Sequence, residues 1–368
     1  MKRIKILSVV GARPNFVKIA PFCHEISKYP DEFQHTLLHT GQHTDYNMSK
    51  EFFELLDIPE PDIHLAALAG SHAVQTADII VKFEKACIQV KPDWVVVVGD
   101  VNSTLACALT AKKSGVRVAH IEAGLRSFDM TMPEEINRKI VDAISDILFA
   151  SSEDACAHLR TEGVDPSHIE YVGNILIDTL CAKLPVIRQK RFYSKWDIEP
   201  KKFVFATLHR PSNVDDPENL NRIIEALGDI TGKVRLLFSI HPRTLNSLQV
   251  HGLLKKIESV RELILTGPVS YHESISLIDN AAAVITDSGG IQEESAFLNV
   301  PCLTLRPNTE RPVTIHYGTN KLTTVTNLQD DIEKILAGIP GRPQSSIPLW
   351  DGKTAQRIVD VFRKMSGQ

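Results

Sequence analysis

The sequence lacks any apolar run approaching the ~18 residues that a membrane-spanning helix requires, so no membrane partner is expected. It also lacks a basic excess, because 41 Lys and Arg stand against 45 Asp and Glu for a formal net charge of -4. Nucleic-acid-binding domains usually carry such an excess, so nucleic acid is not expected as a partner. A chain of 368 residues with 43% hydrophobic residues is long enough for two globular domains.

Cysteine is sparse, with six residues and no CxxC pair. Neither a disulfide framework nor metal-ligand spacing is present, so we predict a protein of the reducing cytoplasm without a bound metal. The start MKRIKILSVVGARP has no long apolar region or small-residue cleavage site, and it is more typical of a first strand than of a signal peptide.

Two nucleotide-binding fingerprints are missing as well. The first predicted strand is not followed by GxGxxG, and GxxxxGK[ST] occurs nowhere in the chain. The sequence therefore predicts neither a nicotinamide cofactor nor a P-loop.

Strand-like apolar runs alternate with helical patterns along the whole chain. This rhythm predicts an α/β protein with parallel sheets and right-handed crossovers. Two Rossmann-like domains facing a cleft is the favoured architecture. A single barrel of eight βα units is the alternative, although about ten strands are too many for it. The expected strands are residues 4–10, 34–39, 94–98, 116–121, 147–150, 203–207, 234–240, 263–266, 283–286 and 302–305.

The boundary between the two domains is expected in the stretch 173–200, which is helical in pattern, richer in charge and interrupted by Pro185 and Pro200. We therefore predict an N-terminal domain over residues 1–172 and a C-terminal domain over residues 173–353. A last helix begins at 354, and the pattern alone allows it to pack on either domain.

Three acidic residues, Asp100, Glu122 and Glu134, carry the strongest chemical signal. Asp100 and Glu122 follow two short apolar runs that are typical of strands buried on both faces of a parallel sheet. The carboxyl ends of such strands form the edge at which open α/β sheets bind ligands. Helix capping would explain Asp100 or Glu134 taken alone. The three together favour proton transfer on a bound substrate.

Cationic side chains follow the first predicted strand. Arg13 and Lys18 come just after Gly11, where a helix is expected to begin, and helix N-termini bind anions. A planar guanidinium can bind phosphate oxygens in a fork and an ammonium adds a point charge. The alternative is that both are solvated surface residues.

A second phosphate-binding signal lies in TDSGGIQEE. Ser288, Gly289 and Gly290 follow an apolar strand and open a helix, where glycines let a phosphate approach the backbone closely. Glu294 is placed to accept hydrogen bonds from the paired hydroxyls of a sugar. The alternative is an N-cap by Asp287 or Ser288, with the glycines serving close packing.

Two histidines and one arginine complete the candidates. His209 and His241 both end predicted strands, where an imidazole can donate to phosphate or transfer protons. Arg311 lies in a loop, and for it alone a surface ion pair with Glu310 is the preferred explanation. Carboxylates in one domain and a phosphate and ribose cradle in the other indicate a nucleoside diphosphate sugar as substrate.

The motifs GARPNFVK, TGQH, GDVNSTLA, HIEAGLR, PEEINR, VGN, TLHR, DSGGIQEE and TERP occur in this order over nearly the whole chain. In this the chain resembles the non-hydrolysing UDP-N-acetylglucosamine 2-epimerases. The resemblance implies a GT-B glycosyltransferase-like fold, a homodimer, and a C-terminal helix over residues 354–368 that crosses back to the N-terminal domain.

The resemblance also implies an epimerisation at C2 of the sugar and a role in it for each matched residue. UDP leaves by anti elimination to give 2-acetamidoglucal and then adds back, which inverts C2 and needs no cofactor. Asp100, Glu122, Glu134 and His209 match the catalytic residues. The residues that match those binding substrate are Arg13, Lys18, Ser288, Gly289, Gly290, Glu294 and Arg311.

A second molecule of UDP-N-acetylglucosamine activates bacterial members of the family, and Gln42, His43, Arg210 and His241 match the residues around its site. The chain reads HRPSN where many members read HRREN, so the acid after the HR pair is lost at this site. The chain also reads GARPN where many members read GTRPE.

Other functions share these motifs. A 2-epimerase of a related UDP-hexosamine, a hydrolysing epimerase that releases free N-acetylmannosamine and UDP, and a GT-B glycosyltransferase are the alternatives among enzymes. A nucleotide-sugar sensor without activity is the non-enzymatic alternative, which the intact carboxylates disfavour.

Overall fold

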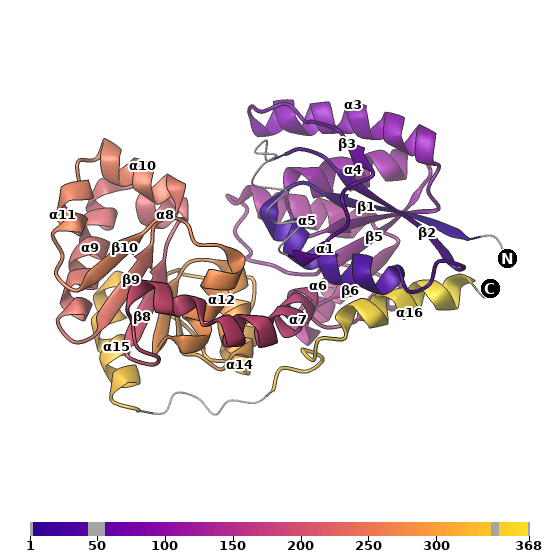
Figure 1. The fold of residues 1–368 in the computed structure, drawn as a ribbon. Coiled ribbons are helices and arrows are strands. Elements are labelled where there is room, and N and C mark those ends of the chain that lie inside the picture. The colour runs from indigo at the N-terminus through magenta and orange to yellow at the C-terminus, as the bar shows by residue number, and fades with distance from the viewer. Residues whose placement is uncertain (1–2, 43–55, 340–345, 367–368) are drawn as a thin grey trace. The chain divides into compact units, whose positions relative to one another are not determined.

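The computed structural model describes residues 3–42, 56–339 and 346–366. The chain divides into two compact units, the first made of Met1–Thr179 with Pro348–Gln368 and the second of Leu180–Ile347 (Figure 1). Each unit is built on one parallel sheet, so the predicted α/β fold with two Rossmann-like domains is confirmed. The single-barrel alternative is wrong, because the strands fall into two separate open sheets.

The first unit contains a seven-stranded sheet in the order β3-β2-β1-β4-β5-β6-β7. The direction in which successive strands are added to the sheet reverses between β1 and β4. At such a switch point, open parallel sheets have a crevice outside the carboxyl ends of the strands, where ligands bind. Its strands are β1 (Ile4–Val10), β2 (Phe33–His39), β3 (Ile63–His64), β4 (Trp94–Val98), β5 (Arg117–Ala123), β6 (Ile147–Ala150) and β7 (Ile169–Tyr171).

Helices cover both faces of this sheet. Val95 and Val97 of β4 pack in one core with residues of α3 and α4, whereas Trp94 faces the other side and meets Phe362 of α16 at a ring distance of 5.5 Å. α16 packs along α1 in this unit (Figure 1). The helices are α1 (Arg13–Ile26), α3 (His72–Val90), α4 (Asn102–Lys113), α5 (Pro133–Ile144), α6 (Glu153–Thr161) and α16 (Thr354–Ser366), with α7 (Ile175–Lys190) leading into the second unit.

The second unit contains a six-stranded sheet in the order β10-β9-β8-β11-β12-β13, and its switch point lies between β8 and β11. Its strands are β8 (Phe203–Thr207), β9 (Arg235–Ser239), β10 (Leu263–Thr266), β11 (Ala283–Thr286), β12 (Cys302–Thr304) and β13 (Asn320–Leu322). Its helices are α8 (Pro211–Val214), α9 (Pro217–Thr231), α10 (Pro242–Val250), α11 (Leu254–Glu258), α12 (Tyr271–Asn280), α13 (Gly289–Phe297), α14 (Val313–His316) and α15 (Leu328–Leu336).

The ten predicted strands all exist, six of them with the predicted bounds. The largest difference is at β5, which runs on to Ala123 and so contains Glu122 instead of ending before it. Three short strands, β3, β7 and β13, were not predicted, because two or three residues carry no recognisable pattern.

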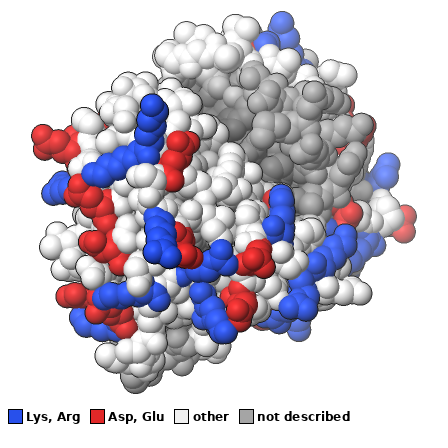
Figure 2. All heavy atoms as spheres, turned by 60° about the vertical axis from the view of Figure 1, so that its left-hand side comes forward, with Lys and Arg blue, Asp and Glu red and all other residues white. Residues whose placement is uncertain are grey.

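Within residues 3–42, 56–339 and 346–366, no helix combines the length and the apolar character needed to cross a bilayer. Acidic and basic side chains lie interspersed on the face shown in Figure 2.

Candidate active site

A buried ion pair joins the first helix to the end of β5. Lys18 of α1 pairs with the carboxylate of Glu122, and both residues are buried. Glu122 has a φ of 73° at the point where the β5–β6 register shifts, a left-handed conformation that is uncommon for a glutamate. Gly99 lies against the pair, since a Cβ on it would lie 3.4 Å from Glu122 Oε2. The ends of β4 and β5 therefore place Glu122 beside the loop that carries Asp100.

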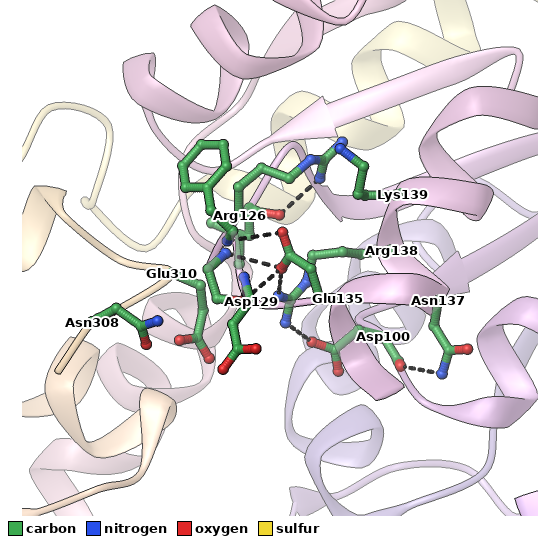
Figure 3. Close-up of polar contacts among 12 residues, drawn as sticks. Asp100, Arg126, Asp129, Glu135, Asn137, Arg138, Lys139, Asn308 and Glu310 are labelled. Carbon is green, nitrogen blue, oxygen red and sulfur yellow. Dashed lines mark hydrogen bonds and ion pairs between the residues drawn. The ribbon is translucent and has the colours of Figure 1, made fainter. Parts of the chain in front are cut away.

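Asp100 is held by α5. Arg138 forms ion pairs with Asp100 and with Glu135, and the side-chain amide of Asn137 donates to the Asp100 carbonyl oxygen over 2.8 Å (Figure 3). Glu134 is half-buried in the first turn of α5 and lies on the same helix face as Asn137 and Arg138, at spacings of three and four residues. The structure thus brings the predicted Asp100 and the α5 face that carries Glu134 together.

Glu135 was not singled out by the sequence, and its role here is structural. It is fully buried and accepts hydrogen bonds from the backbone and hydroxyl of Ser127, both over 2.9 Å, and from the Phe128 amide over 3.1 Å. Burial by itself raises the pKa of Glu135, but the bonds from Ser127 and the charge of Arg138 outweigh it, so the pKa is lowered. Glu135 therefore stays ionised and fixes the loop between β5 and α5.

A second group that the sequence did not reveal lies behind the carboxylates. His120 Nδ1 lies within hydrogen-bonding distance of Asp142, at 2.7 Å, and its Nε2 donates to the Gly99 carbonyl oxygen over 2.8 Å. The other Asp142 oxygen accepts from the Gly124 amide over 3.0 Å and from Arg126 over 2.7 Å. Asp142 thus fixes two glycines near the carboxylates, Gly99 beside Asp100 through His120 and Gly124 near Glu122 directly.

The loop between β1 and α1 is fixed by Asn15, one of the two residues, with Ala12, at which the chain departs from the more common GTRPE motif. Its side-chain oxygen accepts from the amides of Gly11 and Ala12 over 3.2 and 3.0 Å, and its side-chain amide donates to the Val98 carbonyl oxygen over 2.9 Å. The bond to Val98 bridges the switch point between β1 and β4. Arg13 begins α1 directly after this loop, and anion binding by Arg13 and Lys18 stays a prediction.

Of the residues matched to an activator site, Gln42 contacts the first turn of α4 from the loop after β2. Its side-chain oxygen accepts from the backbone and hydroxyl of Ser103 over 2.9 and 2.7 Å. Gln75 of α3 donates to the Gln42 carbonyl oxygen over 3.0 Å. His43 lies outside the described residues.

In the second unit, Asp287 organises the end of β8. This buried carboxylate accepts from the amides of His209 and Arg210 over 3.0 and 2.8 Å and from the side-chain amide of Asn213 over 2.9 Å. It also lies 2.9 Å from His209 Nδ1, which assigns the hydrogen to Nδ1 and leaves Nε2 for a ligand. Burial raises the pKa of Asp287, but the contacts with His209, Asn213 and Arg210 outweigh it and lower the pKa.

The two candidate histidines lie together. The rings of His209 and His241 are 5.1 Å apart, and His241 caps α10 by accepting from the Arg243 amide over 3.2 Å. Arg210 lies 3.6 Å from the carboxylate of Glu310. This unit therefore contains two of the four residues matched to the activator site, Arg210 and His241.

The start of α13 is packed against Arg311. A Cβ on Gly289 would lie 2.5 Å from Arg311 Nη1, so only glycine leaves room for the guanidinium. Arg311 is buried and pairs with Glu293 and Glu310, each over 2.9 Å. The pair with Glu310 therefore exists, but it lies inside the protein and not at the surface, where it was expected. Ser288 and Gly290, on either side of Gly289, are half-buried at the same helix start.

Glu294 lies in α13, in the second turn after Gly289, and is buried. Burial and the neighbouring Glu293 raise the pKa of Glu294 to about 8. A carboxyl group in this state can donate or accept a hydrogen bond near neutral pH, which suits a ligand with hydroxyl groups. Among the described residues, no group of three or more His, Cys, Asp or Glu side chains is arranged to hold a metal ion.

Comparison with known proteins gives the family. The family model described as UDP-N-acetylglucosamine 2-epimerase matches residues 24–363. A Methanococcus maripaludis protein named UDP-N-acetylglucosamine 2-epimerase homolog is 42% identical, over 98% of this chain and 100% of its own. A Pseudomonas aeruginosa UDP-2,3-diacetamido-2,3-dideoxy-D-glucuronate 2-epimerase is 40% identical, over 87% of this chain and 88% of its own.

Among solved structures, the Methanocaldococcus jannaschii UDP-GlcNAc 2-epimerase in complex with UDP-GlcNAc and UDP superposes with a TM-score of 0.90. Its sequence is 38% identical to this one, and the match covers 98% of this chain and 100% of the Methanocaldococcus jannaschii chain. The GT-B-like fold that the sequence motifs implied is thereby confirmed. The chain belongs to the UDP-N-acetylglucosamine 2-epimerase family.

Proposed function

We propose that the protein converts UDP-N-acetylglucosamine reversibly to UDP-N-acetylmannosamine without hydrolysis. The observation that carries the proposal is the meeting of the β4 and β5 ends, where Asp100 and Glu122 lie beside the Glu134 face of α5. Membership of the family and the UDP-GlcNAc bound by the Methanocaldococcus jannaschii relative support the choice of substrate.

The chemistry requires two groups to act on the hexosamine. A carboxylate removes the C2 proton while the C1–O bond breaks, so that UDP leaves with the bonding electrons and a C1=C2 double bond forms in 2-acetamidoglucal. An acid then protonates C2 on the opposite face as UDP adds back at C1. We assign these proton transfers to Asp100, Glu122 and Glu134, with His209 assisting.

Binding of UDP falls to the other candidates. We propose that Arg13, Lys18 and Arg311 supply charge for the diphosphate, and that Ser288, Gly289 and Gly290 supply backbone amides at the start of α13. Glu294 accepts from the ribose hydroxyls. In addition, we propose that the protein forms a homodimer and that a second UDP-N-acetylglucosamine activates it through Gln42, His43, Arg210 and His241.

The test is incubation with UDP-N-acetylglucosamine in deuterium oxide, followed by NMR. UDP-N-acetylmannosamine carrying deuterium at C2 is expected. Free N-acetylmannosamine accumulating with UDP would identify a hydrolysing epimerase instead. Neither product nor exchange at C2 would refute epimerisation of this substrate.

A second candidate function is 2-epimerisation of a more heavily substituted UDP-hexosamine. It is favoured by the 40% identity to the Pseudomonas aeruginosa relative, whose name gives a 2,3-diacetamido glucuronate. Comparing kcat/KM for that sugar nucleotide and for UDP-N-acetylglucosamine discriminates between the two candidates.

A further inference from the structure

Arg306 is a buried arginine of the second unit, two residues beyond the end of β12. Its side chain is only 4% exposed, and its Nη2 pairs with Glu310 over 2.8 Å. The same nitrogen contacts Asn308 Oδ1 over 3.4 Å, and both acceptors are labelled in Figure 3. Its Nη1 is buried too, but no described residue accepts a hydrogen bond from it. The sequence did not single out Arg306.

Arg126, a buried arginine of the first unit, shows how a structural guanidinium is satisfied in this protein. Its Nε and Nη2 donate to Glu162 over 3.0 and 2.5 Å. Its Nη1 donates to Asp142 and to the Leu125 carbonyl oxygen, each over 2.7 Å. All three nitrogens therefore have acceptors from the protein. A buried donor without one costs free energy, so Arg306 Nη1 needs an acceptor from outside the protein, which is either water or a ligand.

The partners of Glu310 place Arg306 beside the proposed phosphate cradle. The other oxygen of Glu310 pairs with Arg311 over 2.9 Å, so a single carboxylate separates the two guanidinium groups. Arg311 lies against Gly289 at the start of α13, where a Cβ would be 2.5 Å from its Nη1. The unused donor of Arg306 is therefore close to the helix N-terminus at which the phosphates are proposed to bind.

The charges around Glu310 favour an anion as the missing acceptor. Ion pairs join three guanidiniums to two carboxylates in one network, Arg210, Arg306 and Arg311 with Glu293 and Glu310. These five groups carry one positive charge in excess. Asp287 lies outside the network, because its carboxylate contacts His209 and Asn213. A diphosphate offers several charged acceptor oxygens, which guanidinium groups bind well.

We propose that Arg306 is a further binding residue for the diphosphate. Its Nη1 donates to a phosphate oxygen, and Glu310 is the positioning residue that holds the guanidinium in place. The inference rests on the proposed binding of UDP and adds to it a residue, a donor atom and a carboxylate that fixes them.

Calorimetry with UDP and with uridine on Arg306→Gln tests the contact. Glutamine removes the charge and the Nη1 donor, so the affinity for UDP should fall by at least about 10-fold. Uridine has no phosphate, and its affinity should stay within about twofold of the wild type. The matched control is Arg188→Gln, whose side chain is 57% exposed in a pair with Asp279, and it should bind both ligands as the wild type does. Equal losses for UDP and uridine, or an unchanged affinity for UDP, would overturn the proposal.

Arg306→Lys separates direct binding from neutralisation of Glu310, and it avoids leaving a buried carboxylate without a cation. The ammonium can pair with Glu310, but it lacks the second nitrogen of the fork. Thermal unfolding should therefore show a folded protein, and the affinity for UDP should still be at least about fivefold below that of the wild type. Wild-type affinity in this variant would refute the contact through Nη1. A wild type that binds UDP while both variants are unaffected would overturn this inference alone, whereas a wild type that binds no UDP would refute the proposed function as well.

Discussion

Asp142 holds His120 so that the imidazole spans from α5 to the end of β4, with Nδ1 2.7 Å from the carboxylate and Nε2 donating to the Gly99 carbonyl oxygen. The imidazole ring and the Arg126 guanidinium contact the same buried carboxylate. This arrangement sets the position of Gly99, and hence of Asp100, from a buried carboxylate on α5.

Replacing Asp142 with Asn should therefore weaken both stability and catalysis. The variant takes from buried Arg126 one of its two carboxylate partners, the other being Glu162, and changes the group that faces His120 Nδ1. We expect a loss of about 1–3 kcal/mol in the free energy of unfolding. The kcat should fall while KM changes little, because the UDP-binding loops are unaffected. Urea denaturation and steady-state kinetics measure these quantities.

Asp215→Asn is the matched control for this prediction. Its carboxylate pairs with Arg243 at the surface, where both side chains are nearly half exposed, so a loss of no more than ~1 kcal/mol is expected. Equal losses in Asp142→Asn and Asp215→Asn would contradict the anchoring role of Asp142.

Gly289 should not accept a side chain. The Cβ of Gly289→Ala would lie 2.5 Å from a guanidinium that two carboxylates hold in place, so the guanidinium cannot turn away freely. We expect a destabilisation of about 1–3 kcal/mol and weaker UDP binding, measured by thermal unfolding and calorimetry. Gly267→Ala is the control, because nothing lies within 4 Å of its Cβ position and both properties should be unchanged there.

Most strands of both sheets could be predicted from the sequence, because strands of a parallel sheet are buried on both faces and therefore consist of short apolar runs. β4, with five buried residues in WVVVV, is the clearest case. β3, with only Ile63 and His64, has no such pattern, and its place at the sheet edge depends on pairing with β2. Strands of this length are defined by their neighbours and not by their own residues.

The candidate site was predictable only in part, for a similar reason. Asp100 could be placed because it directly follows a recognisable strand. Asp142 lies 22 residues from His120 along the chain, and its function as an anchor arises only when α5 packs beside β5. Asp287 was visible as an acid after a strand, but its contacts with His209 depend on the pairing of β11 with β8.

Glu122→Gln should abolish turnover and leave UDP binding in place. The amide keeps the shape of the side chain but can no longer accept the C2 proton, so we expect kcat to fall by at least about 100-fold and deuterium exchange at C2 to disappear. The affinity for UDP, measured by calorimetry, should stay within about twofold of the wild type. Glu199→Gln, at an exposed surface pair, is the control and should retain full activity. Unchanged turnover in Glu122→Gln would refute the assigned role.

Glu294 should make the stability of the protein depend on pH. Folding raises the pKa of this carboxyl group from 4.5 to about 8, because the group is buried next to Glu293. Between these two values the unfolded chain is ionised at this position and the folded protein keeps the proton. Unfolding then releases a proton, so the stability that Glu294 contributes falls as the pH rises from 4.5 and levels off above 8. The slope from this group is at most about 1.4 kcal/mol per pH unit.

Glu294→Gln removes the titrating group and keeps the shape of the side chain. The free energy of unfolding, measured by urea denaturation from pH 5 to pH 8.5, should therefore fall less steeply in the variant than in the wild type. The difference between the two curves isolates Glu294, because all other titrating groups are common to both proteins. If the two curves ran parallel over this range, Glu294 would be ionised in the folded protein, and its proposed contact with ribose would then be that of a permanent carboxylate.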